Sequence, residues 1–359
     1  MECKYNGCKE KSYENNYCIL HMELPLDEES ENFKLINSLK EKKVSEKIKN
    51  GDFNFEGAKL FEIRFINPND KNSIECKENL NLKNSTIKTF VFFGSINIRF
   101  NVLMEGSKIG RNVQFTKYCV VEGEIFLDNS NIGIDVNFIG NENIKKNFKK
   151  GIYFKNAKIG GSISFRDLEL LDDIILNSAK IQSNVKFKNC FIKKYLYIHP
   201  AEIGGTIVFD NTKFKIPFVQ EYSCRKAKNS WEEFGDKEKA DKYFFKEMEA
   251  KRLQKSAHFR YPEWLIQFFF GYGVYPLRVV LTWLGLIMAF SFIFWIGNGM
   301  GGGYSYLESF YSSVVTAATP GYGGFNPQGN YKLAASIEAI FGTFLWAAII
   351  ATFSRKYMR

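Results

Sequence analysis

The sequence has little of what enzymes use. It holds only three histidines in 359 residues, and His199 and His258 stand apart from any paired acid or nucleophile. It has no phosphate-binding loop and no nucleotide fingerprint. It also lacks the ladder of arginines that a voltage sensor needs. We therefore expect neither an enzyme nor a voltage-sensing protein.

The first ten residues contain several charges and no apolar core, so we expect no secretory signal and a soluble part that stays in the cytoplasm. In that reducing compartment, seven cysteines argue against a disulfide framework and leave metal binding open. The formal net charge is +10, but lysine and glutamate are interspersed. A basic domain beside the anionic inner leaflet explains this charge, and we expect no nucleic-acid partner.

Residues 1–260 also lack any apolar run long enough to cross a bilayer, whereas charge almost disappears after Pro262. Val279–Ile296 is free of charge, and Leu333–Phe353 is interrupted only by Glu338. Each stretch matches the thickness of a hydrocarbon core when it is helical. The mean hydropathy of −0.23 thus averages a water-soluble part and a part with two predicted membrane helices in the lipid bilayer.

Basic residues flank these two stretches on one side. Arg278 precedes the first, whereas Arg355, Lys356 and Arg359 follow the second. The connection Gly297–Lys332 contains one lysine and no arginine. The positive-inside rule therefore predicts a multi-pass protein of the cell membrane with both termini in the cytoplasm.

The connection between the two stretches is unusual for a simple hairpin. After a glycine-rich start, Tyr306–Ala317 has the pattern of a short helix, and Thr319-Pro320-Gly321-Tyr322-Gly323 follows. Non-helical backbone at membrane depth is tolerated where it is buried or lines a wet cavity. Glycines allow backbone carbonyls to point at a shared axis and replace the hydration shell of a cation. A second such triplet, Gly271–Gly273, lacks the threonine and leads into a proline, so we interpret it as a turn.

Residues 277–357 resemble the two-transmembrane potassium channels, in which Ser313–Gly323 would be the pore helix and signature filter. The resemblance implies an all-α pore domain over 277–359 with a re-entrant pore helix, assembled as a homotetramer that transports K⁺. It assigns the selectivity filter to Thr319, Pro320, Gly321, Tyr322 and Gly323. It places a hinge at Gly342, which as a small residue is equally explained by helix packing. It assigns the cavity lining to Thr343, Trp346 and Ile350.

Two residues depart from the family pattern. Pro320 stands where an aliphatic residue is usual and removes an N–H, and Gly324 stands where an acidic residue commonly follows. The choice between K⁺ and Na⁺ therefore stays open, and a non-selective monovalent cation channel is one alternative. A membrane-tethered scaffold with a non-conducting pore is another. Glu338 is either a functional charge or a structural group that faces water or the pore helix.

Residues 51–216 carry a repeat in which large apolar residues recur every eleven positions, as at Phe154, Phe165, Leu176, Phe187, Ile198 and Phe209. Such spacing fits a four-sided coil of about twenty-two residues a turn that buries its core by stacking. It resembles the pentapeptide-repeat proteins, which implies a right-handed quadrilateral β-helix. We expect a regulatory or assembly role, with an unidentified ligand or protein as its partner. Nothing in the sequence identifies the gating stimulus.

The remaining segments are shorter. Within residues 1–25, Cys3, Cys8, Cys18 and His21 have the spacing and chemistry of a structural zinc knuckle, with free thiols as the alternative. Residues 26–50 form a helical connector with a helix over Glu31–Lys49. Residues 217–276 form a helical linker, with one helix over Ser230–Gln254 and an aromatic interfacial helix after Pro262.

Overall fold

The computed structural model describes residues 1–66, 73–141, 146–299, 303–318 and 326–358. The chain divides into two compact units, Met1–Tyr243 and Phe244–Arg359. We call them the β-helix unit and the helical unit and describe each by itself.

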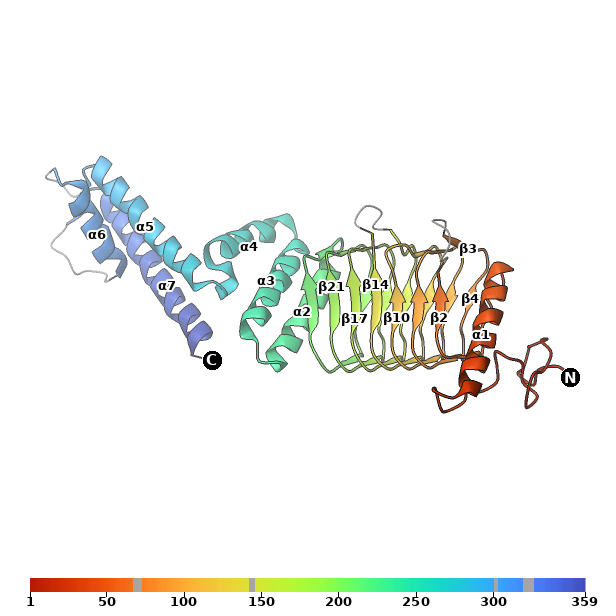
Figure 1. The fold of residues 1–359 in the computed structure, drawn as a ribbon. Coiled ribbons are helices and arrows are strands. Elements are labelled where there is room, and N and C mark those ends of the chain that lie inside the picture. The colour runs from red at the N-terminus through yellow and green to blue at the C-terminus, as the bar shows by residue number, and fades with distance from the viewer. Residues whose placement is uncertain (67–72, 142–145, 300–302, 319–325, 359) are drawn as a thin grey trace. The chain divides into compact units, whose positions relative to one another are not determined.

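The β-helix unit is a coil of short strands that stack in parallel on four sides (Figure 1). Side A consists of β1 (Lys59–Leu60), β5 (Thr86–Ile87), β9 (Lys108–Ile109), β13 (Asn131–Ile132), β16 (Lys158–Ile159), β20 (Lys180–Ile181) and β24 (Glu202–Ile203). Side B consists of β2 (Ile63–Phe65), β6 (Val91–Phe93), β10 (Val113–Phe115), β14 (Val136–Ile139), β17 (Ile163–Arg166), β21 (Val185–Lys188) and β25 (Ile207–Asp210).

Sides C and D complete each turn of the coil. Side C holds two separate sheets, β3 (Ile74–Cys76), β7 (Ile96–Ile98), β11 (Val120–Val121) and then β18 (Glu169–Leu170), β22 (Phe191–Ile192), β26 (Lys213–Phe214). Side D consists of β4 (Leu80–Asn81), β8 (Val102–Leu103), β12 (Ile125–Phe126), β15 (Ile152–Tyr153), β19 (Ile174–Ile175) and β23 (Leu196–Tyr197). The sequence-based prediction of a β-helix is confirmed.

The pairing register follows the repeat. Phe187 pairs with Phe165 and with Phe209, each twenty-two residues away. The step from Phe138 to Phe165 is longer because the chain between these two coils contains extra residues. The rings of side B form a continuous stack inside the coil, with neighbouring centroids 4.2–5.2 Å apart. Stacked apolar rows of this kind give a core that no single coil could bury.

The corners of the coil explain its many asparagines. Asn84, Asn129 and Asn156 have φ values of 53°, 57° and 56°, in the left-handed region that asparagine tolerates better than most residues. Asn189 and Asn211 also have left-handed backbones but lie at a different corner, between sides B and C, and their amides donate hydrogen bonds to the residue one turn earlier, at 2.8 and 3.0 Å. The side chains between the apolar rows therefore shape the turns.

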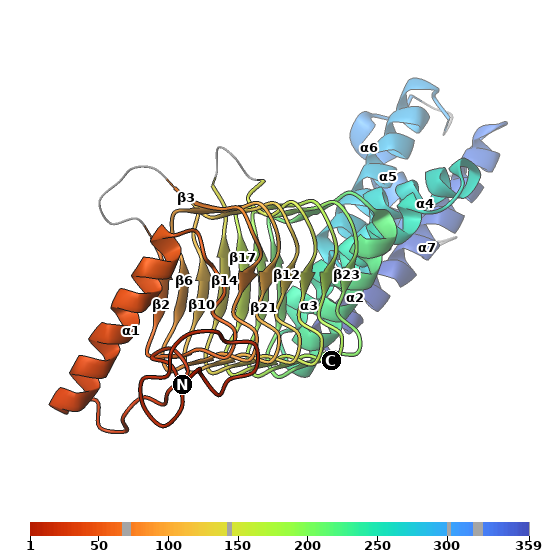
Figure 2. The same ribbon diagram turned by 90° about the vertical axis from the view of Figure 1, so that its right-hand side faces the viewer.

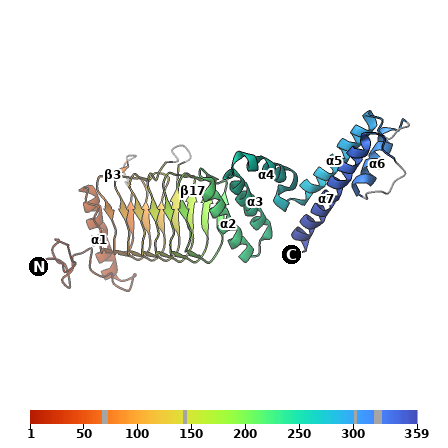
Figure 3. The same ribbon diagram turned by 180° about the vertical axis from the view of Figure 1, so that it is seen from behind.

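Helices cover both ends of the coil. Helix α1 (Glu31–Lys49), as predicted from the sequence, lies against the first coil and buries Phe33, Ile36 and Val44 (Figure 2). Helix α2 (Pro217–Glu233) lies against the last coil (Figure 3). At this end of the coil, the Trp231 Nε1 of α2 donates to the Ile207 carbonyl at 3.1 Å. The Phe209 N–H donates to the hydroxyl of Tyr243, from the helix that follows α2, at 2.8 Å. These contacts satisfy backbone groups that an open sheet edge would expose.

One sequence-based prediction is wrong. The single helix expected over Ser230–Gln254 is two helices, α2 and α3 (Lys237–Leu253). The break lies at Gly235, whose φ of 87° ends the first helix in the left-handed region.

The helical unit holds α4 (Ala257–Phe270), a 3-10 turn at Gly271–Gly273, α5 (Pro276–Ile296), α6 (Tyr306–Ala318) and α7 (Tyr331–Tyr357). The triplet Gly271–Gly273 is thus a turn, as expected. Among the described residues, α5 and α7 are long and apolar enough to cross a membrane, with hydropathies of 2.3 and 1.9. Helix α4 exposes its aromatic residues and begins before Pro262, earlier than the sequence suggested.

Candidate pore and metal centre

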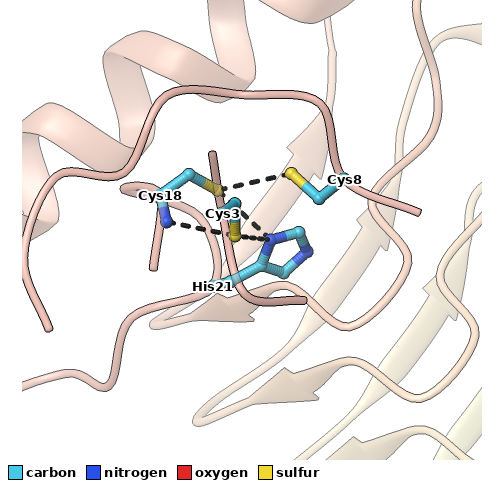
Figure 4. Close-up of side chains that lie close together, drawn as sticks. All are labelled: Cys3, Cys8, Cys18 and His21. Atoms are coloured by element: carbon cyan, nitrogen blue, oxygen red, sulfur yellow. Dashed lines mark hydrogen bonds between the residues drawn. The ribbon is translucent and has the colours of Figure 1, made fainter. Parts of the chain in front are cut away.

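The four predicted metal ligands come together at the N-terminal end of the β-helix unit (Figure 4). Their ligand atoms all lie within 4.8 Å of one another. The His21 Nδ1 is 3.4 Å from the Cys3 Sγ and 3.2 Å from the Cys18 Sγ. The Cys8 Sγ is 3.8 Å from the Cys18 Sγ. Ligands about 2.3 Å from a tetrahedral zinc would be about 3.8 Å apart, so the separations in this cluster are compatible with zinc.

A second contact fixes the histidine for this role. The other ring nitrogen, Nε2, donates to the Glu56 carbonyl at 2.8 Å. With Nε2 as the donor to this carbonyl, Nδ1 is the ring nitrogen that faces the sulfurs of Cys3 and Cys18 and could bind a metal. Tyr5 stacks on the imidazole at 4.2 Å between ring centroids. Gly57 allows that stacking, because a Cβ there would lie 2.1 Å from the Tyr5 ring.

The chemistry of the cluster is also compatible with a bound cation. Burial raises the pKa of Cys8 to about 12, and the neighbouring cysteines add to the rise. Bringing several thiolates together in a buried site is costly unless a metal ion neutralises them. Four protein ligands leave no open position, so the arrangement suits a structural site and not a catalytic one.

Sequence reasoning missed Lys40, which ties this cluster to α1. The side chain is 1% exposed, and its Nζ donates to the carbonyls of Ile19 and Met22 at 2.6 and 2.8 Å. Desolvation lowers the pKa of Lys40 to about 8. The Leu20 carbonyl accepts a hydrogen bond from the Lys59 N–H of β1 at 2.7 Å. The metal cluster is therefore part of the cap that closes the first coil.

In the helical unit, α6 begins with a reciprocal cap. The Ser305 hydroxyl accepts from the Glu308 N–H at 3.4 Å, and the Glu308 carboxylate accepts from the Ser305 N–H at 2.7 Å. This capping box fixes the start of a thirteen-residue helix that would otherwise be marginal. The helix ends at Ala318, immediately before the predicted filter sequence.

Glu338 is buried between the helices. It is 0% exposed, and its Oε1 accepts a hydrogen bond from the Ser313 hydroxyl of α6. The Ser313 Oγ also lies 2.9 Å from the Ile287 carbonyl of α5. Ser313 and Glu338 thus join all three helices at one point, and Glu338 faces the short helix, which was one of the alternatives left open by the sequence.

Gly342 lies where α7 packs closely against α6. A Cβ at this position would be 2.5 Å from the Ala317 carbonyl oxygen and 2.6 Å from the Ala317 Cα. The close approach by itself accounts for a glycine here. Whether Gly342 also acts as a hinge stays a prediction.

Thr343, Trp346 and Ile350 lie on a stripe of α7 away from its buried face. That buried face holds Glu338, Gly342, Leu345 and Thr352. Trp346 is 47% and Ile350 58% exposed, and Trp346 also approaches Trp283 of α5, with 5.5 Å between ring centroids. The role of these three residues in lining a cavity stays a prediction. The five predicted filter residues, Thr319–Gly323, and the departure at Gly324 lie outside the described residues.

Comparison with known proteins agrees with this geometry. Residues 279–359 match the family model described as ion channel. The helical unit contains an ion channel domain. The match begins in α5, spans α6 and α7, and confirms the resemblance drawn from the sequence. No curated protein and no solved structure matches the chain. With its two apolar helices and this channel domain, the chain is a membrane protein, and the domain and the β-helix point to transport rather than catalysis.

Proposed function

We propose that the chain is one subunit of a homotetrameric potassium channel in the cell membrane, with both termini in the cytoplasm. K⁺ would pass through a filter built from the backbone carbonyls of Thr319–Gly323. Thr343, Trp346 and Ile350 would line the cavity below. The match of residues 279–359 to the ion channel family carries this proposal.

The arrangement of the channel domain supports it. Two apolar helices flank a short capped helix that ends directly before the filter sequence. The C-terminal end of a helix carries partial negative charge, which stabilises a cation nearby. The peptide carbonyls of Thr319, Pro320, Gly321 and Tyr322 remain available for coordination even though Pro320 has no N–H.

The β-helix unit would serve assembly or regulation in the cytoplasm. Its N-terminal cluster of Cys3, Cys8, Cys18 and His21 would hold a structural zinc ion. The distances within the cluster and the hydrogen bond from His21 to Glu56 support zinc. The aromatic helix α4 would lie at the inner surface of the membrane, because Tyr261, Trp264 and Phe268 are exposed on it.

Ion flux into liposomes tests the conduction proposal. The purified full-length chain is reconstituted, and uptake is driven first by a K⁺ gradient and then by an equal Na⁺ gradient. Gly321→Asp is the matched negative control, because it alters the filter and leaves the described helices unchanged. We expect K⁺ flux in the wild type, little Na⁺ flux and none in the variant.

Other results would lead to the alternatives. Equal K⁺ and Na⁺ flux would indicate a non-selective cation channel, consistent with Pro320 and Gly324. No flux with either ion, from a tetramer of the correct size, would favour a channel closed in the absence of its stimulus or a scaffold with a non-conducting pore.

A further inference from the structure

The outer surface of side D differs from the other sides of the β-helix. From β8 to β23, its outward positions carry an unbroken column of apolar and aromatic residues, which we call the aromatic stripe: Leu103, Phe126, Tyr153, Ile175 and Tyr197. Each member pairs directly with the next in the parallel register. The rings of Phe126 and Tyr153 stack with centroids 4.8 Å apart, and Tyr197 is 41% exposed. A contiguous apolar surface on a water-soluble domain indicates an interaction site.

Side A carries the opposite chemistry. Its outward positions, which we call the lysine row, are Lys59, Thr86, Lys108, Asn131, Lys158, Lys180 and Glu202. Within the described residues, Lys108 and Lys158 have no recorded ion pair. Lys180 pairs with Glu202 at 2.9 Å, but both side chains are mostly exposed, so the pair contributes little and can exchange.

Acidic residues border the aromatic stripe. The Glu124 carboxylate accepts from the Tyr153 hydroxyl at 2.9 Å. Asp128 and Asp173 accept only from backbone N–H groups of Lys155 and Tyr195, at 2.7 and 3.1 Å. None of these three acids has a recorded ion pair among the described residues. The same border also carries Lys155, whose Nζ lies 6.0 Å from the Tyr153 ring centroid, and Lys194, which pairs with Asp172 at 2.8 Å. The charge complementarity with the ammonium row of side A is therefore local and rests on Glu124, Asp128 and Asp173.

The geometry of the coil makes these two sides neighbours. Strand β19 on side D is followed directly by β20 on side A, so the two faces meet at a corner of a four-sided coil, at roughly a right angle. In a ring of four identical subunits, each subunit also meets its two neighbours in directions a right angle apart. Such head-to-tail contacts join two different faces and close a ring when the rotation fits.

We propose that the β-helices of four subunits form a ring in which the aromatic stripe of each packs against the lysine row of the next. The occupant of the stripe is a second copy of this chain, and the inference rests on the homotetramer of the proposed function. Lysine stems would cover the exposed rings, while their ammonium groups lie over aromatic faces and reach the acidic border. A rotation axis moves each copy around the axis without shifting it along the axis. When the coil axis is parallel to the rotation axis, equivalent coils of neighbouring subunits therefore lie at the same height and face one another.

Cysteine cross-linking in the full-length chain tests this ring. Ile175→Cys places a thiol on the stripe, and Lys180→Cys places one on the lysine row of the same coil. A short bismaleimide is applied to the tetramer in nanodiscs, and light scattering measures the assembly size without cross-linker. The matched control combines Ile175→Cys with Lys186→Cys, whose outward position lies on side B.

A head-to-tail ring predicts a distinctive pattern. The double variant Ile175→Cys/Lys180→Cys should give a ladder of covalent dimer, trimer and tetramer, whereas each single variant and the Lys186 control remain monomeric, like the wild type. Dimers from Ile175→Cys alone would overturn the proposal, because they require stripe against stripe. A tetramer of correct size without the ladder would also overturn it and leave the channel proposal intact. Absence of a tetramer in the wild type would overturn both.

Discussion

The β-helix buries a continuous stack of phenylalanine rings inside its coil, whereas the channel domain presents many of its large apolar side chains on its surface. Phe115, Phe138 and Phe165 of the coil are each 0% exposed. In α7 of the channel domain, Ile340 and Phe344 are 70% and 60% exposed. The first region can thus be stabilised by its own core, while the second needs lipid, and in the proposed tetramer other subunits, to cover its apolar surface. Mutations should therefore act through different mechanisms in the two regions.

We expect the N-terminal cap of the β-helix to depend on a bound metal ion as well as on its apolar core. Cys18→Ser should reduce bound zinc from one ion per chain to none, measured by elemental analysis. A structural zinc contributes on the order of 10 kcal/mol to a small site. Hydrogen exchange of the Lys59 amide should speed up, because its acceptor is the Leu20 carbonyl beside the cluster.

The control for this prediction is Cys190→Ala, which changes a buried cysteine far along the coil. That variant should keep its zinc. If Cys18→Ser kept its zinc and the hydrogen exchange of the Lys59 amide were unchanged, the metal site would not contribute to the stability of the cap.

The stacked phenylalanine rings should contribute directly to the stability of the coil. Phe138→Ala should destabilise the β-helix by about 3–5 kcal/mol, because it removes a ring stacked between Phe115 and Phe165 and leaves a cavity. Chemical denaturation of the full-length chain, followed by the strand signal in circular dichroism, measures the change. Phe100→Ala is the matched control: Phe100 is 54% exposed, so the loss there should be under about 0.5 kcal/mol. Equal losses in both variants would contradict the stacked-core description.

The sequence predicted these regions unequally well for physical reasons. Each coil requires the same kinds of side chain at the same positions. Repetition over six or seven coils therefore makes a weak local pattern of apolar residues recognisable as a regular period. The break at Gly235 depends on a single residue and was missed inside a helical pattern. Lys40 reads as a surface lysine, because its three carbonyl acceptors belong to a segment about twenty residues earlier.

In the channel domain, too, some features were predicted from the sequence and others were not. The two apolar spans are local properties and were found from composition. The reason for Gly342 is a tertiary contact with Ala317, which no local pattern contains. Glu338 likewise could be placed against α6 only when its partner Ser313 was known.

Glycine substitutions sharpen the comparison within the channel domain. Gly342→Ala should destabilise the proposed tetramer by about 1–3 kcal/mol, because its Cβ would overlap the Ala317 backbone and force α7 away from α6. Thermal dissociation in detergent, followed on native gels, measures this effect. Gly285→Ala in α5 is the matched control, since a Cβ there meets nothing within 4 Å. If Gly342→Ala is as stable as Gly285→Ala but alters flux, the hinge interpretation would be favoured over packing.

A loss of similar size should follow from removing the hydroxyl that joins the three helices. Ser313→Ala should cost about 1–3 kcal/mol, because it removes the donor to Glu338 and leaves the buried carboxylate and the Ile287 carbonyl without this partner. Ser336→Ala provides the control, since the Ser336 hydroxyl is exposed and bonds only to the Lys332 carbonyl of its own helix, at 2.9 Å. Both are read by the same thermal dissociation. The double variant Ser313→Ala/Glu338→Leu tests the cause of this loss, since removing both polar partners of a buried pair is often nearly neutral. If the double variant recovers the lost stability, the cost comes from the unpartnered carboxylate rather than from lost packing. No recovery would instead assign the loss to the Ile287 contact, and the channel domain would then depend on α5–α6 packing more than on Glu338.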